Sequence, residues 1–338
     1  MKRIPQLDSV RAIAILAVFF HHALKIKMMW MGVDLFFILS GFLITGVLLS
    51  AKHRTLSGFF AHFYARRARR ILAPYVLWLI VASLFIGVAW MRQWYLYILL
   101  TNLIIPLHIP HPIAFDPLWS LAVEEQFYLA WPFAVYFLSE RRLRNLSILL
   151  IVLAPVLRDL IHFSEHWPIY TLTPFRMDLL AAGALLWLEW ERNRAGIERW
   201  GAKIGAVLAV LGFAGLGLLG HLHISTYGNS RIGNVLVYEF SLFICLGFML
   251  YALSGWRVGW LRLRPLRYLG QISYSMYLVH LGMITLVFTR LQGVAGAALA
   301  LALTIGYAAL SWRFIESPLL GSKPESSAIP GGRLEPRL

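Results

Sequence analysis

The stretch of sequence that decides the fold is VDLFFILSGFLITGVLLS, residues 33–50. It carries a single charged residue, Asp34, and as an α-helix it would extend about 27 Å, close to the thickness of the hydrocarbon core of a bilayer. Nine further apolar segments of similar length cover residues 7–24, 71–91, 118–139, 145–162, 174–190, 202–221, 233–253, 270–290 and 293–313. The sequence therefore predicts an all-α integral membrane protein with about ten transmembrane helices.

The composition of the chain excludes an ordinary soluble protein. Hydrophobic residues make up 59% of the 338 residues and charged residues 14%, whereas soluble domains carry about 25% charged residues. The formal net charge of +15 would point to nucleic acid as the partner of a soluble protein. Because the basic residues here lie between the apolar segments, the positive-inside rule explains them, and we expect the lipid bilayer rather than nucleic acid as the partner.

Loop charges indicate how the chain is threaded. An eleventh apolar segment, WYLYILLTNLIIPL (94–107), is short and contains Pro106, which is typical of an interfacial or re-entrant piece. If it does not cross, the loops and tails on the side of the N-terminus hold 23 of the 31 Lys and Arg residues, and the opposite loops hold six, Arg158 among them. If it crosses, every later basic loop changes sides and the bias is lost. We therefore expect ten crossings of the cell membrane, which in a bacterium is the inner membrane, with both termini in the cytoplasm.

The chain is expected to form one domain. Residues 1–320 contain all the apolar segments and show no short internal repeat. The remaining stretch, GSKPESSAIPGGRLEPRL (321–338), is rich in Pro, Gly and Ser, and we expect it to be a disordered cytoplasmic tail.

Two ionisable residues share one stripe of the first apolar segment. Arg11 and His22 are eleven residues apart, which is about 20° beyond three full helical turns and about 16 Å along the axis. A charge within the bilayer costs several kcal/mol and demands a reason. Imidazole titrates near neutrality and can take a proton from a hydroxyl, so His22 is a candidate general base. The alternative is that His22 only marks the membrane interface.

Three carboxylates lie in apolar segments. Asp34 opens the second segment on the same outer side as His22, and Glu124 and Glu125 lie about two turns into the segment 118–139, which enters from the outside. A carboxylate at such a place could orient His22, so all three are candidate catalytic residues. The alternative is a structural role, in which they pair with the backbone or with a membrane arginine such as Arg11 or Arg176.

A basic run, Arg66, Arg67, Ala68, Arg69 and Arg70, is expected where the third segment leaves the cytoplasm. Such a run can simply anchor a helix, or its guanidinium groups can bind phosphate in a bidentate manner. His108 and His111 have metal-ligand spacing, but no third ligand accompanies them in the sequence, so we expect no metal site.

The chain resembles the acyltransferase 3 family of membrane acyltransferases along nearly its whole length. The blocks that carry the resemblance are LDSVRAIAILAVFFHH (7–22), GVDLFFILSGFLIT (32–45), FYARRARRILAPY (63–75), LWSLAVEEQFYLAWP (118–132), RMDLLAAG (176–183), LGQISYSMYLVH (269–280) and FIESP (314–318).

The resemblance implies a function. It implies acyl transfer, usually from acyl-CoA, to a hydroxyl of a carbohydrate or another extracytoplasmic acceptor, and we expect acetyl-CoA as the donor. The family's Arg-x10-His motif falls on Arg11 and His22. Its Arg-x-x-Arg motif falls on the basic run, where both 66/69 and 67/70 satisfy the spacing. Arg11, Arg66, Arg67, Arg69, Arg70 and Arg176 are therefore the candidate donor-binding residues. Some relatives carry a hydrolase-like domain after the membrane part, and we expect none here.

Several alternatives remain open at this point. The same buried Arg, His and Glu residues could serve a proton-coupled secondary transporter, although the apolar segments show no pairing into repeated halves. The sequence does not choose between surface polysaccharide, peptidoglycan, a lipid-linked sugar or a small molecule as acceptor. It also does not decide whether the donor reaches the outer side or whether the acyl group is relayed, and it leaves the acyl length and oligomeric state open.

Overall fold

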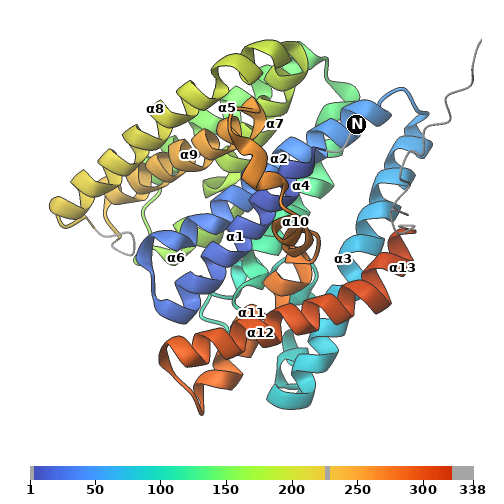
Figure 1. Ribbon diagram of the computed structural model, residues 1–338, viewed down its shortest axis with the longest axis vertical. Helices are drawn as coiled ribbons and strands as arrows, with labels where there is room; N and C mark the ends of the chain where they lie inside the picture. Colours follow the sequence, from blue (N-terminus) through green and yellow to red (C-terminus); the bar gives the residue numbers. More distant parts are fainter. Residues whose placement is uncertain (1–3, 225–228, 322–338) are drawn as a thin grey trace, which may run out of the picture.

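The computed structural model describes residues 4–224 and 229–321, and this part of the chain is helical without a strand. The fold-defining helices are α1 (Pro5–Leu24), α2 (Gly32–Ala51), α3 (Leu56–Ile86), α4 (Leu118–Phe137), α5 (Glu140–Leu160), α7 (Met177–Arg192), α8 (Arg194–His221), α9 (Arg231–Ser254), α10 (Arg264–Gln271), α11 (Ser273–Phe288) and α12 (Gly293–Ser311) (Figure 1). Two short helices, α6 (Trp167–Thr171) and α13 (Ser317–Leu320), complete the set of α-helices. The predicted tail lies, apart from Gly321, outside the described residues.

Each of the ten predicted apolar segments overlaps a helix, but not all of these helices have the length and hydropathy of a membrane span. Among the described residues, six candidate spans meet both conditions, and they lie on α1, α2, α3, α8, α9 and α12. A seventh candidate is the pair α10 and α11, which is bent by 74° at Ile272. The chain is thus a multi-pass membrane protein, whereas the count of ten crossings stays a prediction.

The third helix corrects the predicted boundary of 71–91. The helix begins at Leu56, where the Thr55 side chain accepts a hydrogen bond from the Gly58 N–H at 3.3 Å, and it continues to Ile86. Alanine and arginine are strong helix formers, so the basic run extends the helix instead of ending it. The arginines 66–70 therefore lie on the surface of a helix, and their direction depends on its rotation.

The segment 94–107 forms no long helix, in agreement with its predicted exclusion from the spans. It runs through the short 3₁₀ helices η2 (Ala89–Tyr97) and η3 (Thr101–Leu103), and η4 (Ile113–Phe115) follows. Side chains of the neighbouring helices hold its irregular backbone. The Tyr75 hydroxyl donates to Tyr97 O at 2.9 Å, and the Gln126 amide donates to Leu99 O at 2.7 Å. Irregular backbone of this kind is stable near a membrane only when protein groups satisfy it.

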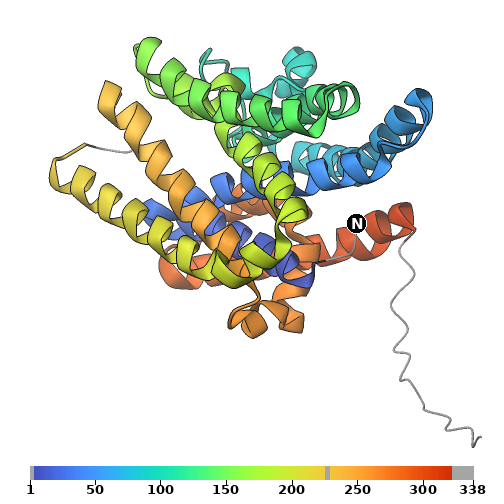
Figure 2. The same ribbon diagram turned by 90° about the horizontal axis from the view of Figure 1, so that it is seen from above.

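Small residues set the closest helix contacts. A Cβ atom added to Gly41 of α2 would lie 1.9 Å from Leu180 O of α7, and one added to Gly183 would lie 2.0 Å from Ile38 O. The helices α8 and α9 make a similar contact through Gly205 and Gly247 and form a pair at one side of the molecule (Figures 1 and 2). Backbone contact at small residues is a common way for membrane helices to associate. The α2–α7 contact fixes the register of two helices that carry buried charges.

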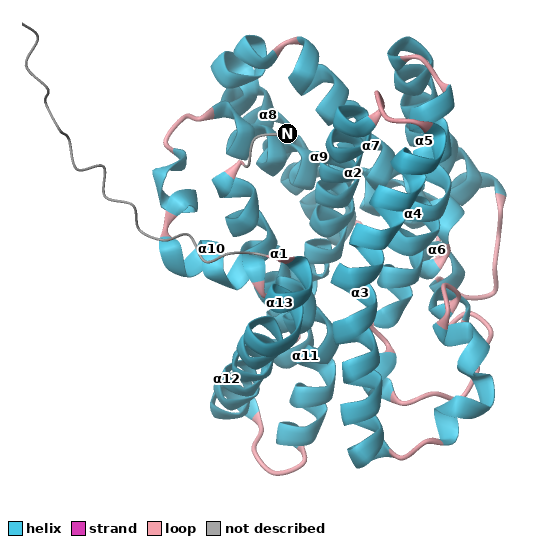
Figure 3. Ribbon diagram, turned by 90° about the vertical axis from the view of Figure 1, so that its right-hand side faces the viewer, coloured by secondary structure: helices cyan, strands magenta, loops and turns pink. Residues whose placement is uncertain are grey.

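The two ends of the helix bundle are predicted to face opposite sides of the membrane. The helix α1 begins in the upper half of Figure 3, and the connection between α11 and α12 lies at the lower end. Which end faces the cytoplasm stays a prediction from the loop charges.

Candidate active site

A cavity of about 820 Å³, counted with its open mouth, lies between α1, α2, α3, α4 and α11. Aliphatic and aromatic side chains form much of its wall. The polar and charged residues that line it are Arg11, Ser40, Arg67, Arg70, Ser120, Glu124, Glu125, Tyr128, Ser273, Tyr274 and Tyr277. The structure thus brings five of the predicted site residues together in one space, with three guanidinium groups and two carboxylates.

Glu124 is held in place by two hydroxyl groups. Ser40 Oγ donates to Glu124 Oε1 at 2.7 Å, and Tyr128 Oη donates to Oε2 at 2.9 Å. The Tyr128 ring also lies under the guanidinium of Arg67, at 5.5 Å from its Cζ atom to the ring centroid. Glu124 and Arg67 are therefore neighbours through Tyr128, an arrangement in which a cation and an anion both face the cavity. Ser40 and Tyr128 are site residues that the sequence alone did not indicate, although Tyr128 lies one helical turn after Glu124.

The neighbouring carboxylate, Glu125, differs from Glu124. It also lines the cavity, but it makes no hydrogen bond to any other residue in the described part of the chain. It lies in the same wall as Tyr274, whose hydroxyl donates to Ile71 O at 3.2 Å. Glu125 is therefore the carboxylate that is free to contact a bound molecule.

The rotation of α3 separates the arginines of the basic run. Arg67 and Arg70 line the cavity, whereas Arg66 and Arg69 are exposed. Residues three apart share one helix face, so the two arginines of each Arg-x-x-Arg pair point in the same direction. Arg11 approaches the cavity from α1 and forms an ion pair with Asp8 at 3.1 Å.

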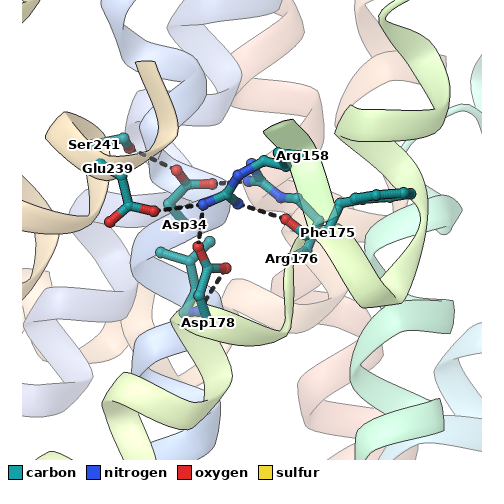
Figure 4. A network of polar contacts seen from close by, with 8 residues as sticks. Asp34, Arg158, Phe175, Arg176, Asp178, Glu239 and Ser241 are labelled. Carbon is teal, nitrogen blue, oxygen red and sulfur yellow. Dashed lines mark hydrogen bonds and ion pairs between the residues drawn. The ribbon is translucent and has the colours of Figure 1, made fainter. Parts of the chain in front are cut away.

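Asp34 and Arg176 lie elsewhere, paired with each other (Figure 4). Both side chains are fully buried, and Ser241 Oγ donates to the second carboxylate oxygen of Asp34 at 2.6 Å. The Arg176 guanidinium is packed against aromatic rings, with its Cζ atom 4.6 Å from the Tyr238 ring centroid. Asp34 thus pairs with a membrane arginine, which is the structural alternative to partnering His22, and Arg176 does not line the cavity, while the catalytic and donor-binding roles of these residues stay predictions. Their proximity reflects the contact between α2 and the start of α7.

A second ion pair network lies beside the first. Arg158 of α5 donates to Asp178 Oδ2 at 2.7 Å, to Glu239 Oε1 at 2.6 Å and to Phe175 O at 2.6 Å (Figure 4). The Arg158 side chain is fully buried, which corrects its assignment to an outer loop. The loop-charge argument missed it because Asp178 and Glu239, which neutralise it, are distant in sequence. Three helices, α5, α7 and α9, are joined by this network.

His22 lies outside the cavity wall and pairs with a histidine. Its Nδ1 is 3.0 Å from Val18 O and 3.3 Å from Nε2 of His280 on α11. His280 in turn stacks near Tyr277, at 5.4 Å between ring centroids, and Tyr277 lines the cavity. The partner that the sequence predicted for His22 was a carboxylate, so the structure assigns a different neighbour. Two sequence signals point to His280: it is an ionisable residue near the middle of the apolar segment 270–290, and the block 269–280 of the resemblance ends on it.

Tyr277 connects the cavity to the histidine pair, because it lines the cavity and its ring also lies near the ring of His280. Tyr277 Oη and Ser120 Oγ are hydrogen-bonded at 2.6 Å, and Tyr277 also donates to Pro117 O at 3.2 Å. The site therefore has a cationic cavity and, next to Tyr277, a pair of imidazoles. Within the described ranges, no group of three or more His, Cys, Asp or Glu side chains could hold a metal ion.

Comparison with known proteins identifies relatives of this chain and the family to which it belongs. It is 31% identical to YrhL of Bacillus subtilis, 30% identical to the peptidoglycan O-acetyltransferase OatA of Listeria monocytogenes and 28% identical to the O-acetyltransferase OatA of Staphylococcus aureus. Each match covers 94% of this chain and 55%, 56% and 57% of the relative, so the chain spans about half the length of these curated relatives. No solved structure matches the chain. A family model described as an acyltransferase domain matches residues 4–314, and the chain therefore belongs to the acyltransferase 3 family of membrane proteins.

Proposed function

We propose that this chain transfers an acetyl group from acetyl-CoA to a hydroxyl group of peptidoglycan or a related cell-envelope carbohydrate, with His22 as the general base. Family membership supports acyl transfer. The relatives named as peptidoglycan O-acetyltransferases support both the acetyl group and the class of acceptor.

The observation that carries the proposal is the state of the His22 ring. Its Nδ1 is occupied by Val18 O and His280. Its Nε2 is not buried and makes no hydrogen bond to any residue that the structure describes. A general base needs an unprotonated nitrogen that a substrate hydroxyl can approach, and the second nitrogen of His22 meets this condition.

The cavity supports a phosphate-bearing donor. Arg11, Arg67 and Arg70 outnumber the two carboxylates, Glu124 and Glu125, that face the same space. Guanidinium groups bind phosphate oxygens through charge-assisted, often bidentate hydrogen bonds. We therefore assign the phosphates of CoA to the arginine side of the cavity.

The acyl end of the donor lies toward His22 in this proposal. Arg11 and His22 are both on α1, eleven residues and about 16 Å apart along the helix axis. Tyr277 lines the cavity and lies near His280, so we expect the pantetheine arm to pass the hydrogen-bonded hydroxyl groups of Tyr277 and Ser120 for direct transfer.

In the proposed reaction, His22 accepts and returns the proton. The acceptor hydroxyl gives its proton to His22 Nε2 while its oxygen attacks the carbonyl carbon of the thioester. The carbon–sulfur bond breaks, and the leaving CoA sulfur takes the proton back from the imidazolium. The products are an O-acetyl ester and CoA, and the imidazole is restored.

The test is a transfer assay with purified protein in detergent or nanodiscs. Acetyl-CoA and muropeptides are supplied, release of free CoA is measured, and acetylated muropeptides are identified by mass spectrometry. His22→Ala should lower transfer by about 10²–10⁴-fold, which is the usual contribution of general-base catalysis, and leave acetyl-CoA binding nearly unchanged.

The adjacent His21 provides a matched control. Its ring lies 5.1 Å from the His22 ring, and its Nδ1 contacts Ile26 O at 3.1 Å rather than His280. We expect His21→Ala to keep substantial activity. Turnover of the His22→Ala variant at a near wild-type rate would show that His22 is not the base, and absence of any acetylated product with the wild-type protein would exclude this acceptor class.

A further inference from the structure

His280 is placed to control the base. It lies on α11, which packs against α1 near the centre of the molecule (Figure 1), and its side chain is fully buried. Its Nε2 is 3.3 Å from His22 Nδ1, and its Nδ1 is 2.7 Å from Tyr277 O. It does not line the cavity that we assign to the donor.

The hydrogen bonds determine which ring nitrogens carry protons. A carbonyl oxygen can only accept, so the contact with Tyr277 O places the proton of His280 on Nδ1 and leaves its Nε2 as an acceptor. In the same way, the contact with Val18 O places the proton of His22 on Nδ1. The Nδ1–H of His22 then donates to both Val18 O and His280 Nε2, and His22 Nε2 keeps its lone pair.

The two acceptors of this proton are not equivalent. Val18 O lies one turn back on the same helix, where an α-helix already directs the backbone N–H of His22 to it. His280 comes from another helix, 258 residues away in sequence, and its lone pair has no other described donor. Only His280 therefore fixes the ring relative to a second element of the fold.

We propose that His280 is a positioning residue that holds His22 in the Nδ1–H tautomer with Nε2 directed to the acceptor hydroxyl. This inference rests on the proposed role of His22. When His22 takes the acceptor proton, its Nδ1–H becomes a cationic donor, and the bond to His280 strengthens because charge-assisted hydrogen bonds are stronger than neutral ones. A neutral imidazole performs here the orienting task that a carboxylate performs in a Ser-His-Asp triad, without a further buried charge.

Two substitutions separate this role from packing. Phenylalanine at position 280 keeps an aromatic ring but removes the acceptor, whereas the amide oxygen of glutamine can still accept from His22 Nδ1–H. We expect His280→Phe to lower kcat by about 10²-fold or more, because a base in the wrong tautomer or orientation removes the proton of the hydroxyl group much more slowly. The KM for acetyl-CoA should stay within about threefold, because His280 is not on the donor cavity. His280→Gln should recover most of the kcat, and His221→Phe, at the exposed end of α8, serves as the control.

The tautomer gives a readout that does not depend on activity. In protein with ¹⁵N-labelled histidine, the ring nitrogen shifts distinguish protonated from unprotonated nitrogens, and the His22 signals are identified by their loss in His22→Gln. Wild-type His22 should carry its proton on Nδ1, and His280→Phe should give a mixture of the two tautomers.

These experiments can overturn the positioning role of His280 and the general-base role of His22 separately. A His280→Phe variant with near wild-type kcat, or with a large loss of kcat and an unchanged His22 tautomer, would overturn the positioning role. So would a folded His280→Gln variant that is as inactive as the phenylalanine variant. If the tautomer shifts as expected but His22→Ala remains active, the general-base proposal fails while the structural link between the two histidines stands.

Discussion

The carboxylate of Asp34 and the guanidinium of Arg176, 142 residues apart in the chain, form an ion pair in which both side chains are fully buried. Removing one partner of such a pair leaves an unpaired buried charge and costs about 3–5 kcal/mol. We expect Arg176→Met to lower the thermal stability in detergent strongly. The double variant Asp34→Leu with Arg176→Met should be more stable than either single variant.

The Arg176→Met variant also tests whether Arg176 has a structural role or a role in donor binding. Neither residue lines the cavity, so acetyl-CoA should bind the folded Arg176→Met variant with unchanged affinity. Thermal unfolding and isothermal titration on one preparation measure both quantities. A stable Arg176→Met variant with greatly weakened acetyl-CoA binding would return Arg176 to the donor site.

The rotation of α3 gives a prediction for the basic run. Arg67→Ala and Arg70→Ala should each weaken acetyl-CoA binding by roughly 10- to 100-fold, because a lost hydrogen bond to a charged group is worth about 1.5–3 kcal/mol. Arg66→Ala and Arg69→Ala are matched controls on the exposed face of the same helix, and their dissociation constants should stay near wild type. Equal effects at all four positions would show that the run acts only through its total charge.

The two cavity carboxylates should respond differently to amide substitution. Glu125→Gln breaks no described hydrogen bond, so the thermal stability should not change. We expect kcat to fall by at least about tenfold, because this cavity carboxylate is a candidate for assisting proton transfer. Glu124→Gln replaces an oxygen that accepts from Ser40 or Tyr128, which should lower stability by about 1 kcal/mol. Steady-state kinetics with a thermal shift measurement tests both, and wild-type kcat in Glu125→Gln would exclude its catalytic role.

The connection between α3 and α4 should give the protein a local pH dependence. The hydrogen bond between His111 Nε2 and the Asp116 carboxylate, at 2.7 Å, raises the pKa of the His111 imidazole. A raised pKa in the folded state contributes stability that is complete below the unfolded value of about 6.5 and is lost as the pH rises through the folded value. The melting temperature should therefore fall over this window, and Asp116→Asn should reduce that fall.

His108 offers the control for this pH effect. It contacts Glu165 at 3.4 Å in an exposed pair, and its backbone lies at φ 51°, which asparagine tolerates. His108→Asn should leave the pH dependence of the melting temperature nearly unchanged. An Asp116→Asn variant with the full wild-type dependence would show that the His111–Asp116 pair does not cause it.

The loop charges also predict the sidedness of the chain. A reporter fused after residue 338 should be cytoplasmic, and one inserted in the connection between α8 and α9 should be extracytoplasmic. Paired phosphatase and fluorescent-protein fusions measure this directly. Activity on the opposite side at either point would contradict the count of ten crossings.

The sequence by itself determined the class of the protein and the approximate positions of its long apolar helices. Apolar runs such as 33–50 predict membrane helices because the requirement to satisfy every backbone hydrogen bond inside a bilayer is local to each segment. The spacing of Arg11 and His22 likewise follows from the geometry of one helix. The extension of α3 back to Leu56 was missed because hydropathy, not helix propensity, set the predicted boundary.

Only the tertiary structure decided which charged residues meet. Arg67 and Arg70 face the cavity because α3 is rotated that way, and Asp34 meets Arg176 because α2 and α7 are in register at Gly41 and Gly183. The pairing of His22 with His280 joins helices that are distant in the chain. Contacts between helices depend on their rotation and relative shift, which close backbone packing sets and which the periodicity of a single helix does not contain.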